Sequence, residues 1–207
     1  MSEQDYFAVF SLPLHLQVDV PALEKAFYAQ SRKLHPDRFA AAGPAEQESA
    51  LAASSRLNDA YRTLKDPILR TQYLLSLEGV ELEEQSKAAT EAARSSGTQK
   101  KQIVPPELLE EVFELNMQLM EMKSARQMGD EADPELKRNL EAAAKQFAAK
   151  MSATQAELEQ LWTRWDNVLD AGDEEGKSAA RDAMVALLNK RSYLRNLVRD
   201  VDAALEA

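Results

Sequence analysis

The stretch SRKLHPDRFAA at residues 31–41 places a proline between a histidine and an aspartate, directly after a basic, helix-forming segment. Proline lacks a backbone N–H and restricts the residue before it, so a helix is expected to end here. We therefore expect His35, Pro36 and Asp37 to lie on a loop between two helices. Such a loop would present an imidazole, a rigid ring and a carboxylate to a partner.

Patterns on both sides of this stretch predict two antiparallel helices. Before it, Asp19 is placed to cap a helix that has Pro21 in its first turn. After it, a second loop precedes a long helix that begins near Pro44. Each predicted helix has one apolar face, formed by Leu23, Phe27 and Leu34 in the first and by Leu57, Tyr61, Leu64 and Ile68 in the second.

A further cap and a glycine mark the end of this region. Asp66 should cap a helix that stops at Gly79. Residues 1–80 therefore predict a helical hairpin with small helices at each end. Residues 81–104 are rich in Ser, Ala, Thr, Lys and Gln, which indicates a linker.

Residues 105–207 predict three long helices joined by short turns, which is the pattern of an antiparallel bundle. The first covers residues 107–128, and Asp133 should cap the second. Trp162 and Trp165 lie on the apolar face of that second helix and are expected in the core, and an acidic turn at 170–177 precedes the third helix. With 6 Gly, 8 Pro and 44% apolar residues, the whole chain is predicted to be all-α.

The charge and the reactive residues exclude several classes of protein. The formal charge of −10 argues against nucleic-acid binding, because phosphate contacts need clustered Lys and Arg. Zero cysteines and two histidines lead us to expect no disulfide, no metal site and no cofactor. No segment reaches the about 18 to 20 consecutive apolar residues of a spanning helix. The acidic start MSEQDYF lacks the features of a signal peptide, so a cytoplasmic protein without a membrane partner is expected.

Several segments together resemble a known family. The His-Pro-Asp turn between antiparallel helices resembles the J-domain of DnaJ-type co-chaperones. The segments DYFAVFSLP, KLHPDRF and LNDAYRTLKDPILRTQYLLSLEG are similar to the HscB family of iron–sulfur cluster co-chaperones, which have an N-terminal J-domain and a C-terminal three-helix bundle. The resemblance implies a non-enzymatic adaptor with two partners, a DnaK-type ATPase chaperone (HscA-like) and an iron–sulfur scaffold protein (IscU-like).

The resemblance also implies a role for the turn. In the family it docks on the chaperone and stimulates ATP hydrolysis. Asp37 would offer its carboxylate to a partner arginine, Pro36 would fix the backbone, and His35 would pack and hydrogen-bond. Basic residues nearby would speed the encounter with an acidic partner, namely Lys25, Arg32, Lys33 and Arg38. The alternative interpretation of these four is a solvated helix face.

The helix expected at 107–122 has more apolar residues than one buried face needs. One stripe consists of Leu108, Val112, Leu115, Leu119 and Met122. A second consists of Leu109, Phe113 and Met120, with Met117 beside it and with an acidic rim of Glu110, Glu114 and Glu121. Because the outer helix of a small bundle buries one stripe, the second predicts an exposed binding surface. A deeply buried helix is the alternative.

In the HscB family the corresponding helix binds the scaffold. The resemblance assigns client contacts to Leu108, Leu109, Phe113, Glu114, Met117, Glu121 and Tyr193. Three alternatives remain: a J-domain co-chaperone for a different client, a helical enzyme with Asp37 or the Glu cluster as acid and base, or a structural coiled-coil scaffold. The second stripe could also pair with a second copy of the chain.

Overall fold

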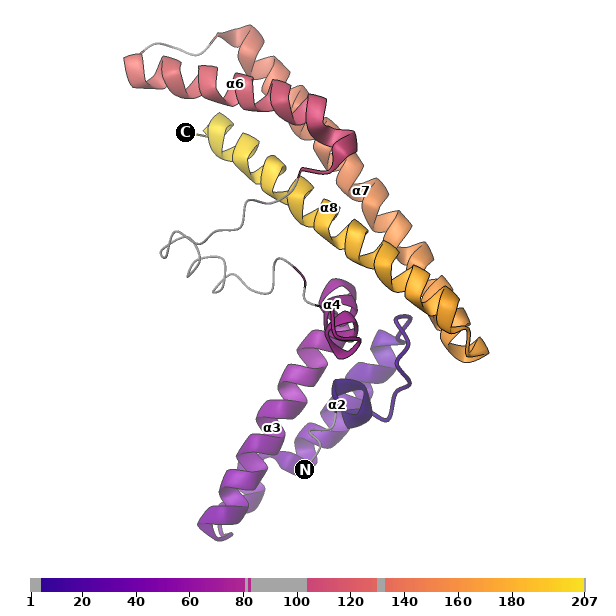
Figure 1. Cartoon of the computed structure of the whole chain (residues 1–207). Helices are drawn as coiled ribbons and strands as arrows, with labels where there is room; N and C mark the ends of the chain where they lie inside the picture. Colours follow the sequence, from indigo (N-terminus) through magenta and orange to yellow (C-terminus); the bar gives the residue numbers. More distant parts are fainter. Residues whose placement is uncertain (1–4, 81, 83–103, 130–132, 207) are drawn as a thin grey trace. The chain divides into compact units, whose positions relative to one another are not determined.

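The computed structural model describes residues 5–80, 82, 104–129 and 133–206 (Figure 1). Every regular element in these ranges is helical, which confirms the predicted all-α fold. The chain divides into two compact units, Met1–Glu81 with Trp162–Arg181 and Leu82–Leu161 with Asp182–Ala207. Most of the predicted linker, 81–104, lies outside the described residues, and the domain boundaries at 80 and 105 stay a prediction.

In the first unit, α2 (Val20–Leu34) and α3 (Pro44–Lys65) form the predicted hairpin, and α1 (Tyr6–Val9) and α4 (Pro67–Leu77) both contact α3. The carboxylates of Asp19 and Asp66 accept hydrogen bonds from N–H groups in the first turns of α2 and α4, so both predicted caps are confirmed. The rings of Phe27 and Tyr61 stack with their centroids 4.2 Å apart. The predicted apolar faces of α2 and α3 therefore meet.

Between α2 and α3 the chain forms a short 3-10 helix, η1 (Pro36–Phe39), where the sequence predicts a loop. As predicted, α2 ends at Leu34, and His35 is extended with φ −61° and ψ 130°, which is the conformation that a following proline favours. The fixed φ of a proline also suits the first position of a helical turn. The connection is therefore locally helical instead of irregular.

In the second unit, α6 (Leu109–Met128) follows the short η2 (Pro106–Leu108) and packs against parts of α7 (Pro134–Ala171) and α8 (Glu174–Glu206), as the predicted bundle requires (Figure 1). The Asp133 carboxylate accepts the Glu135 N–H at 2.8 Å, which confirms this cap. The acidic turn is shorter than the predicted 170–177, because α8 already begins at Glu174. The core consists of Leu108, Val112, Leu115, Met122, Leu136, Leu140, Phe147, Tyr193, Leu194, Leu197 and Val201.

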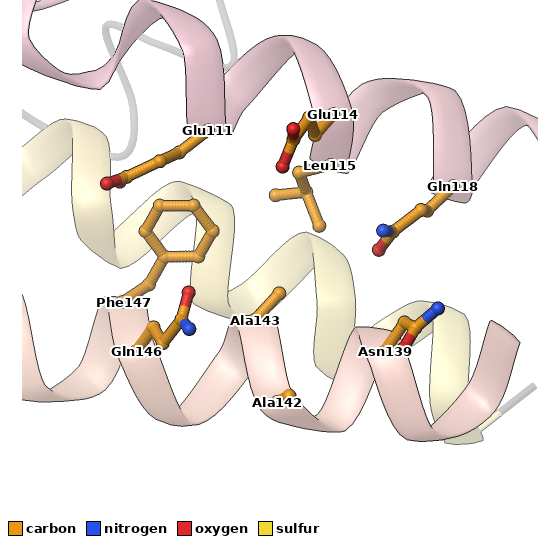
Figure 2. Close-up of a pocket in the computed structure, with 9 residues that line it drawn as sticks. All are labelled: Glu111, Glu114, Leu115, Gln118, Asn139, Ala142, Ala143, Gln146 and Phe147. Carbon is orange, nitrogen blue, oxygen red and sulfur yellow. The ribbon is translucent and has the colours of Figure 1, made fainter. Parts of the chain in front are cut away.

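A groove of about 300 Å³ lies between α6 and α7 in this second unit (Figure 2). Leu115 and Phe147 are its buried apolar residues, and most of the other residues that line it are polar. Ala142 and Ala143 also line it, and their small side chains leave the space that larger residues would fill.

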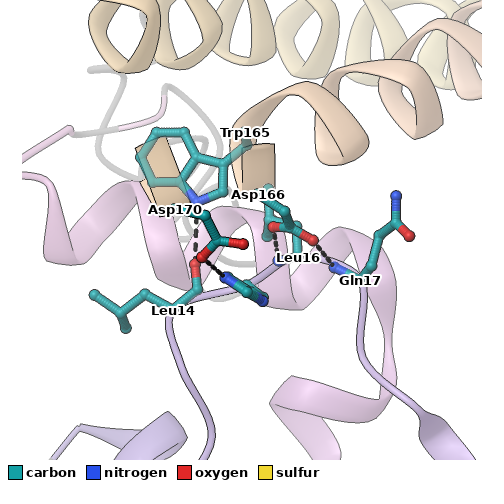
Figure 3. A network of polar contacts seen from close by, with 7 residues as sticks. Leu14, Leu16, Gln17, Trp165, Asp166 and Asp170 are labelled. Atoms are coloured by element: carbon teal, nitrogen blue, oxygen red, sulfur yellow. Dashed lines mark hydrogen bonds and ion pairs between the residues drawn. The ribbon is translucent and has the colours of Figure 1, made fainter. Parts of the chain in front are cut away.

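The last turns of α7 belong to the first unit, where they hold residues 14–17 (Figure 3). The Asp166 carboxylate accepts the Leu16 N–H at 2.6 Å and the Gln17 N–H at 2.9 Å. The indole N–H of Trp165 donates to the Leu14 carbonyl at 3.0 Å, and His15 Nε2 lies 2.8 Å from an Asp170 oxygen. The sequence reasoning did not anticipate this contact.

A buried arginine completes this network. Arg70 is 5% exposed and donates its Nε–H to the Leu16 carbonyl at 2.9 Å and an Nη1–H to the Leu64 carbonyl. Burial lowers the pKa of Arg70, and the negative charges of Asp166 and Asp66 oppose that effect. Trp162 and Trp165 are both buried, which confirms that they are core residues.

Candidate functional site

The predicted His-Pro-Asp turn follows directly after α2. The side chains of His35 and Asp37 are 58% and 89% exposed. The His35 Nδ1 atom accepts the Asp37 N–H at 3.4 Å and lies 3.5 Å from a carboxylate oxygen of Asp37. The Asp37 carboxylate therefore stays open to solvent. The His35 imidazole beside it contacts Asp37 within the same turn.

All four predicted basic residues are exposed. Arg32 and Lys33 lie in the last turn of α2, where positive charge also complements the helix dipole, and Arg38 lies in η1. Lys25 and Arg32 share a face of α2 with Tyr28, which is 55% exposed. The sequence reasoning missed Tyr28, although its spacing of three and four residues from Lys25 and Arg32 could have revealed it.

The second unit confirms the predicted surplus of apolar surface on α6. Val112, Leu115 and Met122 of the first stripe are at most 5% exposed. The second stripe is open, with exposed fractions of 54% for Leu109, 67% for Phe113, 58% for Met117 and 73% for Met120. We call these four residues the α6 stripe. Neighbouring exposed apolar side chains of this kind mark interaction surfaces.

The predicted client residues do not all lie on this surface. Leu109, Phe113 and Met117 are exposed, and Glu114 and Glu121 are exposed on the same helix. Leu108 and Tyr193 are instead 1% and 9% exposed and belong to the core of the second unit. These two side chains pack in the core beneath α6 and are not part of its exposed surface.

The buried position of Tyr193 has a measurable consequence at alkaline pH. Burial raises the pKa of Tyr193, because the ionised phenolate is poorly solvated there. The stability that comes from burying the neutral Tyr193 side chain is fully present below about pH 10, the ordinary tyrosine pKa. It is lost as the pH rises through the raised pKa of the folded state. We expect the free energy of unfolding, measured by urea titration, to fall less steeply above about pH 10 in Tyr193→Phe than in the wild type. Equal slopes of unfolding free energy against pH for Tyr193→Phe and the wild type above about pH 10 would contradict the prediction.

Neither a metal-binding cluster nor a membrane-spanning helix occurs among the described residues. Within these ranges, His, Asp and Glu side chains do not gather in any group of three that could hold a metal ion. In the same part of the chain, no helix is both long and apolar enough to cross a bilayer.

Comparison with known sequences links the chain to one set of proteins. No family model matches it. A co-chaperone protein HscB homolog from Burkholderia multivorans is 31% identical over 204 residues, which cover 99% of this chain and 95% of the relative. The HscB homolog from Bordetella petrii is 44% identical over 93 residues, which cover 45% of this chain and 55% of the relative. The chain thus spans only about half the length of this second relative.

Solved structures show the same all-α fold. Chaperone HscB from Vibrio cholerae matches with a TM-score of 0.59 and 24% identity over 98% of both chains. Human co-chaperone protein HscB matches with a TM-score of 0.57 and 25% identity over 98% of this chain and 83% of that chain. The helical fold of this chain is thus shared with a class of co-chaperones. The chain belongs to the HscB co-chaperone family.

Proposed function

We propose that the protein is a non-enzymatic adaptor in iron–sulfur cluster assembly. It stimulates the ATPase of a DnaK-type, HscA-like chaperone through the turn at His35, Pro36 and Asp37, and it delivers an IscU-like scaffold held on the α6 stripe. The observation that carries the proposal is the open α6 stripe, because four large apolar side chains on one exposed helix face are costly unless a partner covers them. We expect this to take place in the cytoplasm.

The two sites have complementary chemistry. The turn offers a carboxylate within a basic neighbourhood, which suits a chaperone surface that carries an arginine and acidic groups. The α6 stripe offers adaptable methionines at 117 and 120 and acids along its edge, which suits an apolar segment with basic flanks. Joining the two sites in one chain raises the effective concentration of the scaffold at the chaperone.

Removing two side chains of the α6 stripe tests the scaffold half of the proposal. We expect Leu109→Ala/Phe113→Ala to weaken scaffold binding by more than about tenfold, because each side chain is buried only in the complex. Calorimetry with the cognate scaffold measures the affinity, and steady-state ATP hydrolysis by the cognate chaperone measures the stimulation. The double variant should keep the stimulation seen without scaffold and lose the additional effect of scaffold.

The matched control is Leu51→Ala, which removes an apolar side chain that is 63% exposed on α3. It should change neither measurement. Unchanged scaffold affinity in the double variant would contradict the assigned surface. Stimulation of the chaperone without any scaffold binding by the wild type would instead indicate a different client.

A further inference from the structure

The groove between α6 and α7 contains acceptor atoms that lack donors. Glu111 Oε2 and Gln118 Oε1 are both buried and have no hydrogen-bond partner. The other oxygen of Glu111 pairs with the Lys150 ammonium at 3.0 Å, so this side chain is held in place by one of its two oxygens. A buried acceptor without a donor costs free energy, which a bound group with N–H donors would recover.

The remaining lining groups fit the same kind of ligand. Glu114 and Gln118 point from α6 toward the space between the helices, and Asn139 points toward it from α7 (Figure 2). Carboxylates accept hydrogen bonds only, and the amides of Gln118, Asn139 and Gln146 each provide an acceptor oxygen. The groove is therefore rich in acceptors. Lys150 neutralises the charge of Glu111, and the carboxylate of Glu114 adds a second negative charge that favours a cationic donor.

The shape and the apolar residues favour a guanidinium over a compact ammonium. A guanidinium is flat, has five N–H donors and is weakly hydrated, so it can lie against the ring of Phe147 and the methyl groups of Ala142 and Ala143 while its edge meets the acceptors. The volume of about 300 Å³ is at the lower end of the range for small-molecule sites and has room for one long side chain.

Sequence continuity with the α6 stripe indicates where such a side chain would come from. Phe113 and Met117 of the stripe are followed directly by Glu114 and Gln118 of the groove. A segment that covers the stripe can therefore extend a long side chain across this edge of α6. We propose that the groove is a subsite for an arginine of the protein that docks on the α6 stripe, an inference that rests on the proposed function.

Two small probes test the chemistry of the groove directly. We expect acetyl-arginine amide to shift the side-chain amide signals of Gln118, Asn139 and Gln146 in NMR spectra of the full chain. Acetyl-citrulline amide has the same shape without the charge and should not shift them. Gln118→Met should weaken the arginine probe about tenfold, since it removes an acceptor for a charged donor. Gln127→Met, the same change at an exposed site on α6, should have no effect.

Equal shifts with both probes, or full arginine binding by Gln118→Met, would overturn the subsite. With the scaffold as ligand, Gln118→Met should weaken binding about tenfold and Gln127→Met should not. If Leu109→Ala/Phe113→Ala weakens scaffold binding while Gln118→Met does not, the subsite is wrong and the proposed function stands. If the arginine probe binds as expected but the scaffold does not bind at all, the scaffold assignment is wrong and the guanidinium site stands.

Discussion

Replacing Asp166 with alanine is expected to lower the free energy of unfolding of the first unit by about 3 kcal/mol. The Asp166 carboxylate is 9% exposed and accepts two backbone N–H groups, one of them from the fully buried Leu16. Its charge also acts on the guanidinium of Arg70, which is itself buried. Alanine would leave a buried donor without an acceptor and would remove one of the two nearby anions of a buried cation.

The intrinsic fluorescence of the chain can report this loss selectively. Both tryptophans of the chain, Trp162 and Trp165, lie in the first unit, so a urea titration followed by tryptophan emission monitors that unit. Asp170→Ala is the matched control, because the Asp170 side chain is 67% exposed and its partner in this network is the His15 imidazole. This control should cost less than about 1 kcal/mol. Similar losses in the two variants would show that the buried carboxylate does not hold residues 14–17.

Asp37→Asn is expected to reduce the stimulation of the chaperone's ATPase by at least about tenfold at limiting concentration. The Asp37 side chain is 89% exposed, so the amide should fit without any effect on folding. The substitution weakens the charge-assisted hydrogen bond to a partner arginine, because a neutral amide is a poorer acceptor than a carboxylate. The affinity for the scaffold should be unchanged, in contrast to the Leu109→Ala/Phe113→Ala variant.

The control for this change is Asp59→Asn, which neutralises a carboxylate on α3 that pairs with Arg62 at 2.8 Å. It removes the same charge from the same unit, so it separates the role of Asp37 from the effect of net charge. Titrating each variant against the cognate chaperone gives the concentration for half-maximal stimulation. Full stimulation by Asp37→Asn, or an equal loss in Asp59→Asn, would contradict the proposed role of the turn.

Local signals made much of this fold predictable. The caps at Asp19, Asp66 and Asp133 are formed by short-range hydrogen bonds, so each can be predicted from a few neighbouring residues. The two stripes of α6 can be predicted in the same way from the helical period, and burial separates them as predicted. The 3-10 turn at Pro36–Phe39 was missed because proline ends one helix and can also begin another helical turn.

Contacts between distant segments could not be predicted in this way. The hydrogen bonds from Leu16 and Gln17 to Asp166 join residues about 150 positions apart, and no local pattern encodes such a pairing. The groove depends on which residues of α7 face Gln118, and therefore on the relative register of two helices. One sequence does not specify that register, because Ala142 and Ala143 are ordinary helix residues until a partner helix faces them.

The placement of Trp162–Arg181 with the N-terminal helices affects how the chain can be divided or recombined. A fragment that stops at residue 80 would keep the His-Pro-Asp turn but lose Trp165 and Asp166, which cover and hydrogen-bond the loop at Leu14–Gln17. The backbone N–H of Leu16, a residue with no exposed surface in the whole chain, would then lose its acceptor. The N-terminal hairpin should therefore not be transferred alone. A chimera that joins it to another protein should also include residues 162–181.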